Sequence, residues 1–228
     1  VTLVSDLSHE VRTLLGGVIG LNELLLAGQL DHQQRQLSQT IEHSSRSLLA
    51  VLNNIVELTR LEGGRVKEEL ASIDLQRLAA EAQQQNHDLR RLKDTVRFDC
   101  SAPPTAVVLL GDATRVRQIL SLLISRAVTA VHEGVVRLTI SSGEAASGSV
   151  KVRFVLDFEP VSEFECASLS ALNEPQAYTG KYDSRWLSCL LCTSLVQFLD
   201  GICGAGRSGE KCNIWVELPL KSPGTQPA

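Results

Sequence analysis

Two apolar repeats with the same seven-residue period constrain the first 64 residues more than any other feature of the chain. In the first repeat, steps of four and three residues alternate through Leu7, Val11, Leu14, Val18, Leu21 and Leu25. Helices pack along one side as coiled coils when their apolar residues have this spacing. The repeat therefore predicts one long helix with an apolar seam.

A second helix of the same kind follows a short turn. The stretch "AGQLDHQQ" turns the chain, because Gly28 is a stop signal and Asp31 is suited to cap the next helix. The repeat then resumes through Leu37, Ile41, Ser44, Leu48, Val51, Ile55 and Leu58. Gly63 and Gly64 end this helix. Two antiparallel helices cannot bury such seams alone, so we expect a dimeric four-helix bundle.

The remainder of the chain alternates between the strand and helix patterns. Helices are expected at 112–131 and 185–199, and strands at 135–141, 150–156 and 213–218. This alternation predicts an α/β two-layer sandwich. Between these elements, Gly, Pro and Ser in 162–183 predict irregular structure.

The fold class is therefore expected to be α+β, with two domains and a tail. We expect an antiparallel helical hairpin at 1–66, a two-layer sandwich at 67–221 and a linker at 222–228. The chain opens at Val1 directly in a helical pattern and ends in "KSPGTQPA". From these ends we expect it to be part of a longer protein, with missing flanking domains.

Composition excludes some classes of function. The net charge is −4, from 22 basic and 26 acidic residues, which argues against a nucleic-acid binder that neutralises phosphates. No apolar run approaches the roughly 20 residues of a membrane span. The cysteines lie mostly in apolar patterns without metal-ligand spacing, so we expect reduced, buried thiols and no metal site. They are Cys100, Cys166, Cys189, Cys192, Cys203 and Cys212.

A His-Glu pair near the start of the first helix lies off the apolar seam. His9 follows Leu7 by two residues and is flanked by Ser8 and Glu10, so its imidazole is expected to face solvent. On the helical pattern alone, an ordinary surface histidine is the simpler interpretation.

The order of residues around this pair favours a chemical role. "SHEVRT" followed by "GVIGLNELLL" resembles the H-box of sensor histidine kinases, in particular the dimerisation and phosphoacceptor hairpin of hybrid kinases. The resemblance implies that His9 accepts a phosphoryl group, that Glu10 assists it, and that Thr13 positions water for phosphatase chemistry. Leu14 stands where the family usually has proline, which predicts a straighter or differently bent helix.

The second domain resembles the HATPase (Bergerat) nucleotide-binding domain of the same family. The lead-in Gly-Asp-x-x-Arg-x-x-Gln is matched by Gly111, Asp112, Arg115 and Gln118. Two asparagines that hold magnesium and phosphates in the family are replaced by Leu122 and Arg126. Leucine offers no oxygen ligand and arginine repels the metal. The alternative is an unrelated α/β sandwich in which these motifs never existed.

Two further nucleotide motifs are altered. Asp157 stands where an aspartate reads the adenine amino group, but Glu159 and Val161 replace the glycines that follow it.

In the last glycine box, the frame residues Lys181, Tyr182 and Leu187 match. The glycines of this box are replaced by Asp183, Ser184, Trp186 and Ser188. Such a loop normally wraps triphosphate with bare backbone N–H groups. The resemblance thus implies a degenerate site with no tightly bound cofactor and impaired binding of ATP and magnesium.

The resemblance implies a regulatory pseudokinase of two-component signalling, similar to orphan hybrid sensors of the RetS type. It would act through its hairpin to inhibit or dephosphorylate a partner, as a homodimer or as a heterodimer with a cognate, GacS-like sensor kinase. Receiver or phosphotransfer domains are further expected partners. Such a chain would be the cytoplasmic region of an inner-membrane-anchored bacterial sensor. Two alternatives stay open: an active autokinase with unusual nucleotide contacts, and a phosphorelay acceptor that uses His9.

Overall fold

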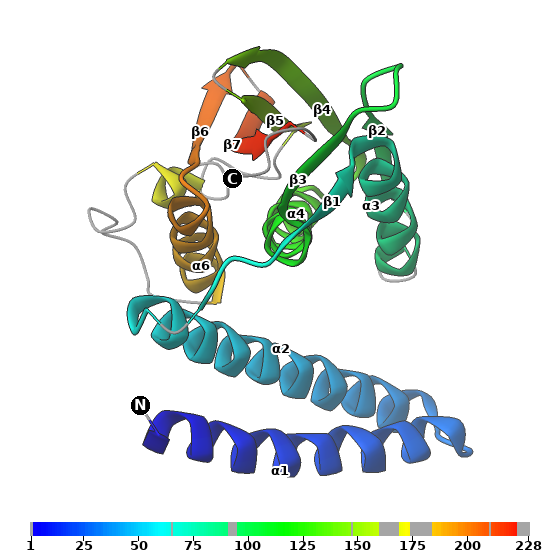
Figure 1. Cartoon of the computed structure of the whole chain (residues 1–228). Coiled ribbons are helices and arrows are strands. Elements are labelled where there is room, and N and C mark those ends of the chain that lie inside the picture. Colours follow the sequence, from blue (N-terminus) through cyan, green and yellow to red (C-terminus); the bar gives the residue numbers. More distant parts are fainter. Residues whose placement is uncertain are drawn as a thin grey trace. The chain divides into compact units, whose positions relative to one another are not determined.

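A computed structural model describes residues 2–64, 66–90, 95–146, 148–159, 169–173, 184–209 and 211–222. The chain divides into two compact units, Val1–Val66 and Lys67–Ala228. Figure 1 shows the elements of both units. In the described part of the chain, no helix is long and apolar enough to span a membrane.

The first unit is a hairpin of two long helices, α1 (Thr2–Ala27) and α2 (His32–Glu62) (Figure 1). Helix α1 continues past Leu14 without interruption, because every residue there can donate its backbone N–H to the helix. Asp31 caps α2 through a capping box: its carboxylate accepts from the Gln34 N–H at 2.8 Å, and the Gln34 side chain accepts from the Asp31 N–H.

The two helices contact each other through a stripe that lies one residue away from the predicted seams. We call these residues the contact stripe, and each of them is buried, half-buried or bonded across the hairpin. On α1 they are Ser8, Arg12, Leu15, Ile19, Asn22 and Leu26, and on α2 they are Ser38, Glu42, Ser45, Leu49, Leu52, Val56 and Thr59. Neighbouring residues point about 100° apart around a helix axis. The predicted seams therefore point in a different direction from the contact stripe.

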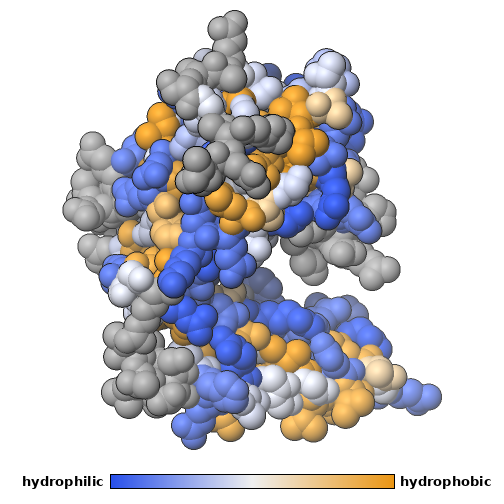
Figure 2. All heavy atoms as spheres, viewed as in Figure 1, coloured by the Kyte–Doolittle hydropathy of each residue, from blue (hydrophilic) through white to orange (hydrophobic). Residues whose placement is uncertain are grey.

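Most of the predicted seam is exposed in the single chain. Its large apolar side chains, here called the outer stripe, are 40% to 67% exposed: Leu14, Val18, Leu21, Leu25, Leu37, Ile41, Leu48 and Ile55. Val11 and Val51 are half-buried, and Leu58 is buried. Figure 2 shows apolar surface between hydrophilic patches on the hairpin. The more apolar of the two stripes therefore remains uncovered.

The second unit contains one seven-stranded sheet. Its strands are β1 (Leu70–Asp74), β2 (Val96–Ser101), β3 (Val108–Asp112), β4 (Gly134–Ala146), β5 (Ser149–Phe158), β6 (Ile202–Ser208) and β7 (Lys211–Lys221). The order is β1-β3-β7-β5-β4-β2, and β6 pairs with β7 off this path. All pairs are antiparallel except β2 with β4, which is parallel.

Helices cover one face of this sheet and enclose the core. They are α3 (Leu75–Arg90), α4 (Ala113–Ala130) and α6 (Ser184–Phe198), with a short 3-10 helix, η1, at Leu169–Leu172. Figure 1 shows α3, α4 and α6 along the same side of the sheet. Alternate residues of the central strands point into this layer, and the sheet and helices together bury Phe98, Ile119, Leu123, Phe154, Leu195 and Ile214. The predicted α+β fold of a helical hairpin and a two-layer sandwich is confirmed.

The cysteines differ in part from the prediction of reduced, buried thiols. Cys212 is disulfide-bonded, which corrects the prediction at that position. Cys189 and Cys192 are free and buried, whereas Cys100 and Cys203 are free and half-buried. Burial raises the pKa of Cys203 to about 11, so little of this thiol is the reactive thiolate at neutral pH.

Candidate functional site

The His-Glu pair lies on the outer side of α1. Ser8 is 3% exposed and faces α2, whereas His9 and Glu10 are both exposed. Successive helix residues are about 100° apart, so the burial of Ser8 leaves the next two side chains outside the intrachain contact. The imidazole is therefore accessible to a reacting partner, as the sequence predicted.

Thr13 stands one turn after His9 on the same helix. Its hydroxyl donates to the His9 carbonyl oxygen at 3.0 Å, and the side chain remains exposed. A threonine hydroxyl in this bond still has lone pairs that can accept a hydrogen bond from water. The geometry brings His9, Glu10 and Thr13 together on adjacent turns of one helix.

Arg12 joins this part of α1 to α2. Its Nη2 atom donates to Oδ1 of Asn53 at 2.9 Å, across 41 residues of sequence. Neither side chain was predicted from the sequence as a site residue. Arg12 belongs to the quoted motif "SHEVRT", but Asn53 has no local signal, because only the pairing of the helices brings the two together.

In the second unit, the residues that match the family's Gly-Asp-x-x-Arg-x-x-Gln lead-in make contacts that stabilise the fold. Asp112 is 3% exposed and caps α4: its carboxylate accepts from the Arg115 N–H at 3.0 Å and from the Glu69 N–H at 3.2 Å. A Cβ at Gly111 would lie 2.7 Å from Cδ2 of Leu220. Arg115 donates to Gln118 at 2.8 Å. These contacts explain the residue types at the lead-in without a nucleotide.

The two positions that correspond to the magnesium-holding asparagines of the resembled family lie on one face of α4. Leu122 is half-buried and Arg126 is 5% exposed. They are four residues apart, the spacing that places side chains on the same helix face. Magnesium takes oxygen ligands, and neither side chain supplies one. These residues do not fit a magnesium-nucleotide complex held in the manner of the family.

Asp157 lies on the opposite side of the sheet from the helices. Along β5, Leu156 and Phe158 are buried under the helices, so the side chain of Asp157 between them points to the other face. There it stands between Arg137 of β4 and Asn213 of β7 in the strand register. Contact with adenine stays a prediction for Asp157, and this placement counts against it.

Part of the last glycine box is helical. Helix α6 begins at Ser184, so Ser184, Trp186 and Ser188 occupy its first turns, and the Ser188 hydroxyl donates to the Ser184 carbonyl oxygen at 2.8 Å. The predicted residues Lys181 and Tyr182 lie outside the described residues, as do Val161 and Asp183. The irregular segment predicted at 162–183 is described only at 169–173, where η1 forms.

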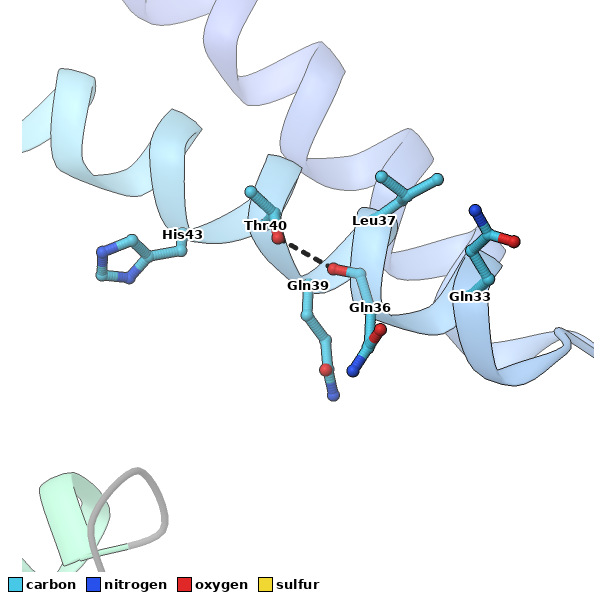
Figure 3. Close-up of a pocket in the computed structure, with 6 residues that line it drawn as sticks. All are labelled: Gln33, Gln36, Leu37, Gln39, Thr40 and His43. Carbon is cyan, nitrogen blue, oxygen red and sulfur yellow. Dashed lines mark hydrogen bonds between the residues drawn. The ribbon is translucent and has the colours of Figure 1, made fainter.

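A shallow pocket on α2 offers little for catalysis. Figure 3 shows Gln36 and Gln39 pointing to one side while Leu37 points away from them, and Thr40 donates to the Gln36 carbonyl oxygen at 2.9 Å. The pocket is lined by Gln33, Gln36, Leu37, Gln39, Thr40 and His43. His43 is its only titratable side chain, so the lining contains no acid-base pair, and His9 is not part of it.

Comparison with known families identifies the hairpin. Residues 1–64 match the His Kinase A (phospho-acceptor) domain. Over 96% of its length, the chain is 30% identical to hybrid signal transduction histidine kinase A of Dictyostelium discoideum. It is 25% identical over 95% of its length to the sensor histidine kinase GacS of Pseudomonas protegens. The chain spans 11% and 24% of the lengths of these two relatives.

A solved structure extends the likeness to both units. The crystal structure of full-length ShkA in complex with AMPPNP matches 97% of this chain, with a TM-score of 0.72 and 25% identity, over 46% of the ShkA chain. The hairpin, the sheet domain and their order along the chain are thus shared with that structure. Residues 1–64 thus match a phosphoacceptor domain, and the comparisons support a transmitter region of a two-component sensor histidine kinase.

Proposed function

We propose that this chain is the transmitter of a regulatory, RetS-type sensor whose own ATP handling is impaired and whose hairpin acts on a partner sensor kinase. The observation that carries the proposal is the contrast between two helices. His9, Glu10 and Thr13 are exposed together on α1, whereas Leu122 and the buried Arg126 stand at the metal-holding places of α4. The chain can therefore receive or remove a phosphoryl group more readily than it can donate one from ATP.

The outer stripe supports action through a second hairpin. Burying a leucine side chain stabilises a complex by about 1.5–3 kcal/mol, and several such side chains are exposed along both helices. A hairpin with the same repeat could cover them, whether from a second copy or from a GacS-like kinase. The similarity of this chain to GacS over 95% of its length favours an interface of that kind.

Two actions on the partner follow from this arrangement. In the first, the hairpin replaces one protomer of the kinase dimer and prevents autophosphorylation. In the second, Thr13 holds the water that attacks the aspartyl phosphate of a receiver domain, so that the P–O bond to the aspartate breaks and inorganic phosphate leaves. Glu10 assists by orienting the His9 ring or by acid-base chemistry.

Titration calorimetry with ATP and magnesium tests the nucleotide part of the proposal. At protein concentrations near 100 μM, we expect no heat, which corresponds to affinity weaker than roughly millimolar. Micromolar binding, together with label transferred from ATP to wild-type protein but not to His9→Gln, would instead establish the active autokinase.

Mixing with a GacS-like kinase tests the hairpin part. We expect a mixed species by native mass spectrometry and a lower rate of autophosphorylation of the kinase. Loss of inhibition in Leu21→Arg but not in Thr13→Ala would assign the effect to pairing, and the reverse pattern would assign it to phosphate removal. Absence of both a mixed species and any effect on phosphorylation across candidate kinases would exclude the proposal.

The exposed imidazole also favours a second candidate, a phosphorelay acceptor. His9 could receive phosphate from another kinase or a phosphorylated receiver domain, since neither step requires a nucleotide site in this chain. Mass spectrometry after incubation with a phosphorylated partner should then find phosphohistidine at His9. Phosphate release without any phosphohistidine would favour the phosphatase reaction instead.

A further inference from the structure

Arg12, which donates a hydrogen bond to Asn53 across the hairpin, stands one turn after the candidate phosphoacceptor on α1. Arg12 follows His9 by three residues, so the two side chains stand on neighbouring turns of the same helix. Nη2 of Arg12 donates to Oδ1 of Asn53 at 2.9 Å, and both side chains are exposed. The guanidinium has five N–H donors, and this bond uses one of them.

The chemistry of the acceptor matters as much as its position. An amide oxygen is neutral, so it orients the guanidinium without cancelling its charge. A carboxylate at the same place would form a stronger, charge-assisted pair and would compete with any incoming phosphate. The carboxylates nearest in sequence to Arg12 and Asn53 are Glu10 on α1 and Glu57 on α2. The acceptor of the hydrogen bond from Arg12 Nη2 is nevertheless the amide oxygen of Asn53.

We propose that Asn53 is a positioning residue that holds Arg12 as a charged phosphate-binding group for chemistry at His9. This inference deepens the proposed function and depends on it for its biological setting. Arg12 would bind the oxygens of a phosphoryl group that is carried by His9 or that approaches on a partner aspartate. Asn53 acts only through Arg12, because it contacts the guanidinium rather than the reacting atoms.

Phosphoramidate, a small phosphoryl donor, tests this without any partner protein. A ring nitrogen of His9 attacks the phosphorus, the P–N bond to the donor breaks, ammonia leaves, and a ring proton is released to solvent or to the leaving amine. The rate of phosphohistidine formation is measured by mass spectrometry on the full chain as a function of phosphoramidate concentration. His9→Gln identifies any signal from other histidines.

Four variants separate charge from position. Asn53→Asp should raise the half-saturating concentration about tenfold by neutralising Arg12, which corresponds to about 1.4 kcal/mol. Asn53→Ala should raise it by a few fold by releasing the guanidinium, and Asn53→Gln, which keeps an amide acceptor, should recover part of the loss. Gln39→Glu adds the same charge on an exposed part of α2 and should leave the reaction unchanged.

Melting temperatures show whether an effect is merely structural. We expect Asn53→Asp to melt no lower than wild type while it loses donor affinity. Wild-type kinetics in both Asn53→Asp and Asn53→Ala would overturn the inference, as would equal effects of Asn53→Asp and Gln39→Glu. A wild-type chain that does not react at His9 would also overturn it. Asn53-dependent phosphorylation in a chain that affects no kinase would leave the inference standing and defeat the proposed function.

Discussion

The hairpin and the sheet domain resemble the same family for different physical reasons. In the sheet domain, the matching residues Gly111 and Asp112 are buried and packed, while Leu122 and Arg126 offer no oxygen ligand where the resemblance would place a metal. In the hairpin, the matching residues His9 and Thr13 are exposed and have little to do with packing. A matched motif is therefore informative about chemistry only when its residues have no role in packing or helix capping.

The two units also differ in how they bury apolar surface. The sheet domain encloses its large apolar side chains between strands and helices, whereas the hairpin leaves the outer stripe exposed and joins its helices through a partly polar stripe. This difference implies a graded series of effects, of which the largest is expected in the outer stripe.

Substitution in the outer stripe should abolish association of the hairpin. Leu21→Arg and Ile41→Arg each place a charge where we expect a second hairpin to bind, and removing one buried leucine costs about 1.5–3 kcal/mol on each side of a symmetric interface. Light scattering should show a change from dimer to monomer, while Gln39→Arg remains dimeric. A wild-type chain that is monomeric near 100 μM would remove the basis of this comparison.

Substitution at the lead-in should destabilise the sheet domain even without nucleotide. Gly111→Val would drive side-chain atoms into Leu220 and should cost about 1–3 kcal/mol. Asp112→Ala loses the cap of α4 and should cost about 1–2 kcal/mol.

Urea unfolding, followed by the fluorescence of Trp215 and Trp186, measures both effects. Asp112→Asn, which can still accept at the cap, serves as the matched control. If all three variants unfold like wild type, the lead-in residues must serve something other than packing.

Removing the buried hydrogen bonds between Asn22 and Ser38 in the hairpin should have a smaller effect on stability and should also affect the register of the two helices. Asn22 donates to the Ser38 carbonyl oxygen at 2.9 Å, and the Ser38 hydroxyl donates to Asn22 Oδ1 at 2.7 Å. A double-mutant cycle with Asn22→Ala and Ser38→Ala should give a coupling energy of about 1 kcal/mol. Additive effects of the two substitutions would show that the pair does not fix the register of the helices.

The smallest expected effect is on the acid stability of the sheet domain. Hydrogen bonds from Arg117 and Arg77 lower the pKa of Glu81, whose carboxylate lies 2.7 Å from Arg117 Nε and 2.9 Å from Arg77 Nε. A lowered folded-state pKa gives stability that is present above the unfolded value, 4.5, and is lost as the pH falls through the folded value.

Glu81→Gln should therefore reduce stability at pH 7 by less than about 1 kcal/mol, since the pair is partly exposed. The difference from wild type should shrink as the pH falls below 4.5, as measured by urea unfolding at pH 7 and in acid. A difference that grows on acidification would contradict the direction of this pKa shift.

Much of the fold could be predicted from local pattern. The helix predicted at 112–131 is α4 at Ala113–Ala130, and the helix predicted at 185–199 is α6 at Ser184–Phe198. The predicted strands are longer in the structure, for example Lys211–Lys221 in place of 213–218. Strand β6 was not predicted, because "ICGAGRS" is rich in glycine and lacks the β-branched alternation that signals a strand.

The candidate site was predictable only in part, because its residues depend on different ranges of sequence. His9, Glu10 and Thr13 are close in sequence and share a helix, so the resemblance of one short motif sufficed to group them. Asn53 could not be predicted as a site residue, because its contact with Arg12 spans 41 residues of sequence. The side chain of Asp157 points away from the helices because the other set of alternate residues in β5 is the buried one. The residue pattern around the motif did not show which of the two sets would be buried.

By itself, the sequence determined that the first 64 residues form two long helices and that the later part forms a sandwich, because periods of three to four and of two residues are local properties. Only the tertiary structure decided which face of each helix meets its neighbour. Two stripes with the same alternating steps run side by side along both helices, one residue and about 100° apart. Local periodicity cannot choose between them, and the choice is made by contacts such as Asn22 with Ser38 and Arg12 with Asn53.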